Sequence, residues 1–496
     1  MKLSPAPGSV LWLLKWDLIQ LYNWFSQGEA KRLGTRWRWA YRAFWLLLIH
    51  SPALLIMLLP TPSRDPSEAR VARDIAFTFL GGMLFLSMVF MAVYTSVSAL
   101  AERKYTETVL TSPLPANTLG RWFIGSNALG TLVGMPLFVL PFVNVIALSG
   151  RPQALLVYAS IAGYALLAAC IGVAASFSLQ RILGTARAKR YVGIIGMTLL
   201  ISSGILISLG MKALQRAQFE PQLWHEFVAG TLRGHWLPSL AVLLAGILAW
   251  RLMAPIAARG VYASAQVQAP PRSAPKSTRA RFSNSPVRAL LTKEWRLMLR
   301  HPMLAMNLAN PMMMLIFPLM HMIDGKGDWR EAMNMTVAFS GGMVVMTAHS
   351  LCWAASAMDE SPSLLWSSPM PREQWRRYQL LAGLIPTWLA MLPLLAIVAW
   401  VSPMKALGLA VISFAGAIAG GLLAQAFYRP VPRHERNMQY GMKAPQVMAM
   451  MAYGAVWGGL STALNGFALG LTLLPIALGV PAWLLMRQEE REFLHD

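Results

Sequence analysis

Residues 154–179 read ALLVYASIAGYALLAACIGVAASFSL, a run of apolar and small side chains without a single charged residue. An α-helix needs about 20 such residues to cross the roughly 30 Å hydrocarbon core of a bilayer. The run also lacks the alternation of apolar and polar residues that is typical of a membrane β-barrel strand. We therefore expect a membrane-spanning helix here.

Similar runs recur along the whole chain of 496 residues. The composition is 56% hydrophobic and only 13% charged, whereas soluble domains contain about 25% charged residues. The mean hydropathy of +0.48 likewise excludes an ordinary soluble domain. We expect an all-α polytopic membrane protein with about twelve transmembrane helices, at residues 43–59, 75–100, 122–148, 154–179, 191–209, 237–253, 303–322, 335–358, 380–401, 407–427, 447–464 and 467–486.

Basic residues are distributed unevenly over the loops between these spans. If the N-terminus is cytoplasmic, about three quarters of the 43 Lys and Arg residues lie on the cytoplasmic side. Cytoplasmic loops of membrane proteins carry such an excess of Lys and Arg. We therefore predict that both termini are cytoplasmic. The same bias accounts for most of the net charge of +22, so we expect no nucleic-acid partner.

Residues 256–287 combine several Pro and Ser residues with basic residues and contain no acidic residue. This composition is typical of a flexible linker. It predicts three parts of the chain: a first six-helix half at residues 1–255 with an N-terminal interfacial helix, a basic cytoplasmic linker at 256–287, and a second six-helix half at 288–496.

The two predicted halves share a short motif at the same place. Ser112-Pro-Leu-Pro115 follows the second predicted span, and Ser368-Pro-Met-Pro371 follows the eighth, 256 positions later. Arg121 and Arg377 are separated by the same distance along the chain. Because each half contains an even number of spans, both halves keep one orientation, and we predict two parallel six-helix repeats.

Each predicted half also begins with an amphipathic segment. Leu11, Leu14 and Leu18 recur at helical spacing in the first half, and Leu291 and Trp295 do so in the second. Amphipathic helices with tryptophan and basic residues lie in the plane of the membrane interface. The alternative, that each segment is only the basic flank of the following span, stays open at this stage.

The sequence lacks the residue patterns that ion coupling, ATP binding, disulfide formation and metal binding require. All 21 Asp and Glu residues fall in loops, interfacial segments or the C-terminal tail, whereas ion-coupled carriers place ionisable groups inside the membrane. No P-loop occurs, so the chain has no ATP site of its own. Cys170 and Cys352 lie within predicted spans and provide neither a disulfide framework nor the spacing of metal ligands. We expect no enzyme activity, metal or bound cofactor.

The loop sequences resemble the ABC-2 type permease family, the membrane subunits of many bacterial ABC exporters. In that family an acidic residue follows the first helical hairpin, and a short helix, a Ser/Thr-Pro-x-Pro-like turn and a basic residue come next. The residues of this chain that match the pattern, and that the resemblance implies couple the permease to its ATPase, are Glu102, Thr106, Glu107, Ser112, Pro113, Pro115, Arg121, Asp359, Glu360, Ser368, Pro369, Pro371 and Arg377.

The resemblance implies the permease subunit of an exporter in the bacterial cytoplasmic membrane. ATP would act through a separate ATP-binding subunit. Because this chain resembles two six-helix units fused together, the resemblance implies that no further permease chain is needed. Two alternatives stay open: an ion-coupled secondary transporter of twelve helices, and a polytopic lipid-modifying membrane enzyme.

Overall fold

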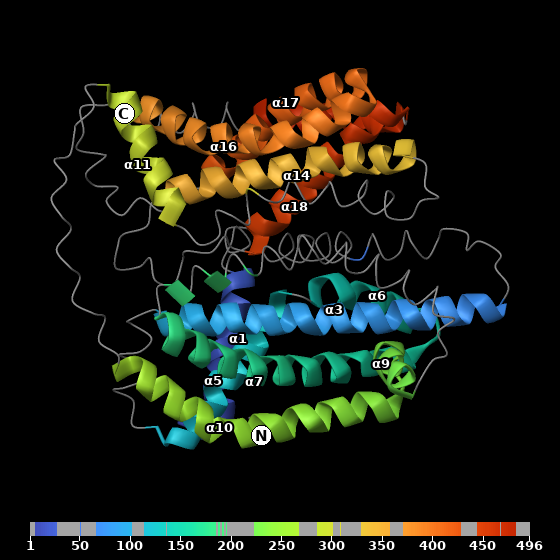
Figure 1. Ribbon diagram of the computed structural model, residues 1–496, viewed down its shortest axis with the longest axis vertical. Helices are drawn as coiled ribbons and strands as arrows, with labels where there is room; N and C mark the ends of the chain where they lie inside the picture. Colours follow the sequence, from blue (N-terminus) through green and yellow to red (C-terminus); the bar gives the residue numbers. More distant parts are fainter. Residues whose placement is uncertain are drawn as a thin grey trace, which may run out of the picture. The chain divides into compact units, whose positions relative to one another are not determined.

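Helices form every regular element that the computed structural model describes (Figure 1). The described residues are 5–26, 50, 66–101, 114–134, 136–184, 187–188, 191–192, 195, 223–266, 285–300, 308, 329–357, 371–427, 444–466 and 468–482. Those up to Gln266 form one compact unit, unit 1, and those from Ser285 onward belong to a second, unit 2. No β-strand occurs within these ranges.

Unit 1 is organised around α7. Its elements are α1 (Val10–Ser26), α3 (Pro66–Ala101), α5 (Ala116–Gly134), α6 (Pro136–Leu148), η2 (Pro152–Leu156), α7 (Val157–Leu183), α9 (Leu223–Arg233) and α10 (Trp236–Gln266). The central helix α7 contacts α3, α5 and α10, and α1 contacts α5. Ala165, Ala168 and Ala169 of α7 are fully buried. Small side chains such as these allow helix backbones to approach closely.

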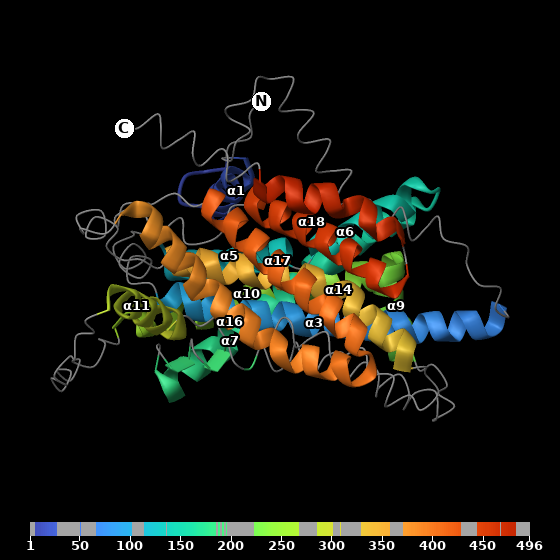
Figure 2. The same cartoon turned by 90° about the horizontal axis from the view of Figure 1, so that it is seen from above.

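Unit 2 is organised around α14. Its elements are α11 (Pro286–Arg300), α14 (Trp329–Ala357), α16 (Arg372–Val401), α17 (Pro403–Phe427), α18 (Ala444–Ser461), η5 (Thr462–Asn465) and η6 (Ala468–Leu473). The central helix α14 contacts α11, α16, α17 and α18 (Figure 2). It buries the hydroxyl residues Thr336, Ser340 and Thr347. The Ser340 hydroxyl donates a hydrogen bond to the Thr336 carbonyl oxygen, so its polar group is satisfied within the helix.

Polar contacts at the two ends of α14 define the course of the chain through unit 2. Near the start of α14, Lys405 Nζ donates to Asn334 Oδ1 at 2.5 Å and to Asn465 Oδ1 at 3.3 Å. Near its end, the Ser356 hydroxyl lies 3.4 Å from Gln379 Oε1. The start of α17 therefore lies at the opposite end of α14 from the start of α16, so successive helices alternate in direction.

Six helices in the described ranges are long and apolar enough to cross a membrane. They are Gly81–Leu100, Pro152–Leu183, Trp236–Ser264, Met333–Ser356, Glu373–Val401 and Pro403–Ala426. Each coincides with a predicted span, so the prediction of apolar helices long enough to cross a membrane is confirmed for these six. Shorter apolar helices occur at Val139–Leu148 and Gly470–Ala482. The predicted spans at 43–59, 191–209 and 303–322 lie almost wholly outside the described residues.

The predicted span at 122–148 is described as two helices. α5 ends at Gly134 and α6 begins at Pro136, and Met135 between them lies outside the described residues. Proline has no backbone N–H and is suited to the first turn of a helix, so Pro136 stands at a favourable position at the start of α6.

The predicted linker at 256–287 begins too early. α10 continues to Gln266, so the first part of the predicted linker is helical. Ala257 and Val261 are fully buried there and belong to the core cluster that also contains residues of α5 and α7. Packing of these small and apolar side chains stabilises the extra turns of α10. Most of the remaining linker, at 267–284, lies outside the described residues.

Glycine contacts bring the helices of both units together. A Cβ atom on Gly163 of α7 would lie 2.6 Å from the carbonyl of Val242 in α10, and one on Gly246 would lie 2.7 Å from the carbonyl oxygen of Gly163. In unit 2, a Cβ on Gly420 of α17 would lie 2.5 Å from the carbonyl oxygen of Val345 in α14. No side chain fits these positions without moving backbone, so the helices pack at the shortest available distance.

We expect Gly420→Ala to lower the thermal unfolding temperature of the detergent-purified protein, because its methyl group would push α17 away from α14. Overpacking of this kind costs about 1–3 kcal/mol. Gly479→Ala is the matched control, since Gly479 is also helical and has no atom within 4 Å of an added Cβ. Both variants gain helix propensity, so equal unfolding temperatures would contradict the glycine-contact interpretation.

Candidate functional site

The predicted coupling residues fall mainly outside the described residues. Four of them are described: Pro115, Arg121, Pro371 and Arg377. The others lie outside, namely Glu102, Thr106, Glu107, Ser112, Pro113, Asp359, Glu360, Ser368 and Pro369. The structure therefore defines the helix ends that flank the two predicted loops, and the assignment of the loop residues stays a prediction.

The two ends of each predicted loop lie close together. α3 ends at Ala101 and α5 begins at Ala116, while α14 ends at Ala357 and α16 begins at Arg372. In unit 1, Leu100 belongs to the same buried cluster as residues from the first turns of α5. In unit 2, the Ser356–Gln379 contact joins the corresponding helix ends. Each loop thus closes a helical hairpin whose two helices are in direct contact.

The helices that follow the two loops begin in the same way. The carbonyl oxygen of Pro115 accepts a hydrogen bond from Leu119 N at 3.1 Å, and that of Pro371 accepts one from Trp375 N at 3.2 Å. Both prolines are exposed. Because the proline ring restricts φ, the entry of the chain into each helix is stiff.

Arg121 and Arg377 are exposed on the first turns of these helices. The backbone carbonyl of Arg121 accepts a hydrogen bond from the Trp250 indole at 2.7 Å. The side chain of Arg377 lies 3.8 Å from that of Glu373, and the two are 77% and 64% exposed. An ion pair this exposed adds little to stability, so both arginines are available to a partner.

Corresponding residues make the contact within each hairpin. Asn127 of α5 donates a hydrogen bond to the hydroxyl of Ser96 in α3, and its side-chain oxygen accepts one from Thr95. The positions 256 residues after Ser96 and Asn127 are Cys352 and Gly383. A Cβ on Gly383 would lie 2.6 Å from Cys352 Sγ. Within each hairpin, the two helices therefore meet at equivalent positions. The contact is a hydrogen bond in unit 1 and a close van der Waals contact in unit 2.

A partly buried carboxylate attaches α1 to α5. Trp122 Nε1 of α5 donates a hydrogen bond to Asp17 Oδ2 at 2.8 Å. Burial raises the pKa of the Asp17 carboxyl above its ordinary value, and hydrogen bonds from Trp122 and Ser126 oppose part of that rise. On the same face of α1, Leu14 packs against Gly125 of α5.

A fully buried carboxylate lies in α11 of unit 2. Glu294 is fully buried, and Lys293 Nζ lies 3.4 Å from its Oε1. The adjacent Trp295 donates its indole N–H to the carbonyl oxygen of Ala382 in α16 at 3.1 Å. Met298, one turn further along α11, packs in a buried cluster with Ala382 and a residue of α14.

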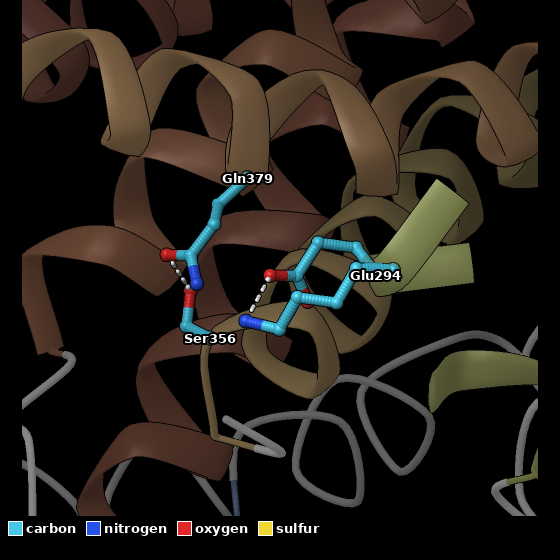
Figure 3. Close-up of polar contacts among 4 residues, drawn as sticks. Glu294, Ser356 and Gln379 are labelled. Carbon is cyan, nitrogen blue, oxygen red and sulfur yellow. Dashed lines mark hydrogen bonds and ion pairs between the residues drawn. The ribbon is translucent and has the colours of Figure 1, made fainter. Parts of the chain in front are cut away.

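Figure 3 shows Glu294 together with the Ser356–Gln379 hydrogen bond. The carboxylate of α11 thus belongs to the contact region where α14 ends and α16 begins. Glu294 is one of the acids expected in loops, interfacial segments or the tail, and the sequence does not predict its burial. Its spacing from Leu290 and Met298, which are both buried, is the signal that could have identified it.

The described residues offer no metal centre, since no group of three His, Cys, Asp or Glu side chains among them could hold an ion. Cys170 and Cys352 are buried free thiols. Comparison of the sequence with protein-family models, with curated proteins and with solved structures finds no match. Functional inference therefore rests on the arrangement of residues described above.

We expect Asp17→Asn to stabilise unit 1 relative to the native chain as the pH rises. The folded protein holds the Asp17 proton more tightly than the unfolded chain, so native stability from this group is greatest below the ordinary pKa of 3.8 and is lost as the pH passes the raised pKa. The asparagine keeps an oxygen acceptor for Trp122 and does not titrate. The difference in unfolding temperature between variant and native protein should grow between about pH 4 and pH 7. A difference that does not vary with pH would contradict this assignment.

Proposed function

We propose that this chain is the permease subunit of an ABC-type exporter, moved by a separate ATP-binding subunit. The observation that carries the proposal is the pair of helical hairpins α3–α5 and α14–α16. Both end in the predicted loops, both restart at an exposed proline, and the corresponding residues Pro115 and Pro371 are 256 positions apart. One hairpin of this kind in each unit would allow two ATP-binding partners to bind the chain, one at each predicted loop.

The full proposal includes about twelve spans in two parallel six-helix halves, within a bacterial cytoplasmic membrane. The alternating directions of α14, α16 and α17 support successive crossings in unit 2. The uneven distribution of Lys and Arg supports cytoplasmic termini. In that orientation, the ends of α3 and α14 and the starts of α5 and α16 face the cytoplasm, where an ATP-binding subunit is accessible.

The chain's own residues would transmit motion in two steps. A partner that binds the loops at 102–113 and 358–370 would push on stiff helix entries at Pro115 and Pro371. Each hairpin would then move as one body, because Asn127 bonds α5 to α3 and Gly383 sits directly against Cys352. The fused halves would form the translocation pathway without a further permease chain.

Electrostatic attraction would guide the partner to the loops. Glu107 in the first loop, and Asp359 with Glu360 in the second, are acidic residues of the predicted cytoplasmic segments. Basic groups on the ATP-binding subunit would pair with them, because charge complementarity raises the association rate and fixes the register of docking.

We expect charge reversal at Glu107, together with Asp359→Lys and Glu360→Lys, to weaken co-purification of an ATP-binding subunit encoded beside this chain by about tenfold or more. Glu226→Lys is the matched control, because Glu226 is an exposed acid on α9, away from the loops. Binding would be measured by affinity capture from detergent extracts, with monodisperse elution of each variant as the check of folding. Equal capture of the loop variant and the control would contradict the proposal.

Transport measurements separate this proposal from an ion-coupled carrier. In liposomes the chain alone should move no cargo in response to a proton or sodium gradient, because no acidic residue lies in the interior of a predicted span. Cargo movement driven by such a gradient without an ATP-binding subunit would overturn the proposal.

A further inference from the structure

The exposed charges of α1 and α11 are all positive. Each helix contains one acidic residue, Asp17 in α1 and Glu294 in α11. Asp17 is partly buried and accepts a hydrogen bond from Trp122 of α5, and Glu294 is fully buried, so both acids point toward the neighbouring helices. The exposed ionisable side chains among the described positions are Lys15 in α1 and Arg288 and Arg296 in α11. The orientation of the two acids therefore leaves the exposed face of each helix with basic side chains.

Apolar side chains are exposed on the same two helices. Leu11 is 67% exposed and Trp16 is 48% exposed on α1, and Leu299 is 71% exposed on α11. Trp12 packs edge to face against Trp16 with ring centroids 5.9 Å apart, so two indole rings lie together at this surface. Tryptophan and leucine beside Lys and Arg are the side chains that helices lying on a membrane present to its headgroup region.

The arginines of α11 have no competing partner among the described residues. Arg288 and Arg296 form no ion pair there, whereas Lys293 lies beside Glu294. Two guanidinium groups thus stay available for an external anion. Guanidinium binds phosphate through paired hydrogen bonds and releases water more easily than an ammonium group does, which suits it to a phospholipid headgroup.

We propose that α1 and α11 each bind the anionic phospholipids of the membrane leaflet against which that helix lies, with α11 as the stronger of the two. The inward-facing acids make this selectivity possible, because an exposed Asp17 or Glu294 would repel the headgroup phosphate. The proposal depends on the membrane location of the chain and not on coupling to an ATP-binding subunit, so the two are tested independently.

The test compares lipid stabilisation of the purified full-length chain and its variants. Thermal unfolding would be followed in neutral detergent with added phosphatidylglycerol or phosphatidylcholine, without any ATP-binding subunit. We expect a larger rise in unfolding temperature with phosphatidylglycerol, suppressed by high salt, because exposed charges are screened. Arg288→Gln with Arg296→Gln should lower the apparent affinity for phosphatidylglycerol by about fivefold per arginine, the equivalent of about 1 kcal/mol for each basic residue near an anionic surface.

Three controls keep the result interpretable. Arg151→Gln removes an exposed arginine outside α1 and α11 and should retain the full effect of phosphatidylglycerol. Arg288→Lys with Arg296→Lys preserves the charge and should retain most of it. Soluble glycerol phosphate should give no shift, because it lacks the acyl chains that would lie beside Leu299.

Equal stabilisation by phosphatidylcholine and phosphatidylglycerol would overturn the proposal. So would an unchanged affinity for phosphatidylglycerol in the Arg288→Gln/Arg296→Gln variant, provided that this variant elutes as a single monodisperse species. A shift with glycerol phosphate as large as that with phosphatidylglycerol would also overturn it, because it would indicate binding of a soluble anion.

Discussion

Close approach between helix backbones is the constraint on which both units depend. Lipid tails are as apolar as leucine, so burying apolar side chains does little to bring helices together inside a membrane. Dispersion contacts and interhelical hydrogen bonds must do so, and both need short distances. Gly163 and Gly246 in unit 1 and Gly420 in unit 2 provide those distances, because a Cβ at each would meet the backbone of the next helix. The hairpins α3–α5 and α14–α16 and their polar contacts depend on this close packing of the helices.

Polar side chains then determine which of the packed helices stay together when the protein moves. Asn127 lies between α3 and α5 with its amide hydrogens and its oxygen satisfied by the other helix. Separating the two helices would break several hydrogen bonds together in a medium that offers no replacement for them. Lys405 has the corresponding effect at one end of unit 2, where it joins α17 to Asn334 and Asn465.

The polar contacts of their acids orient α1 and α11. An apolar stripe tolerates some rotation of a helix about its axis, because many rotations bury similar areas. A hydrogen bond such as Asp17–Trp122 tolerates little, because its energy falls steeply with angle. Burying the carboxylate costs free energy, and the consequence is a defined outer face that bears Lys15 and Trp16. In α11 the burial of Glu294 has the same consequence.

Much of the fold could be predicted from the sequence, because hydropathy depends on neighbouring residues alone. The run at 154–179 predicts its helix without reference to any other segment, and Pro115 and Pro371 mark helix starts through their own restricted φ. The contact between Asp17 and Trp122 could not be predicted, because these residues are 105 positions apart and their meeting depends on how two helices rotate and pack. For the same reason the sequence by itself determined where the long apolar helices run, whereas only the tertiary structure decided that α1 turns Asp17 toward α5 and that α11 buries Glu294.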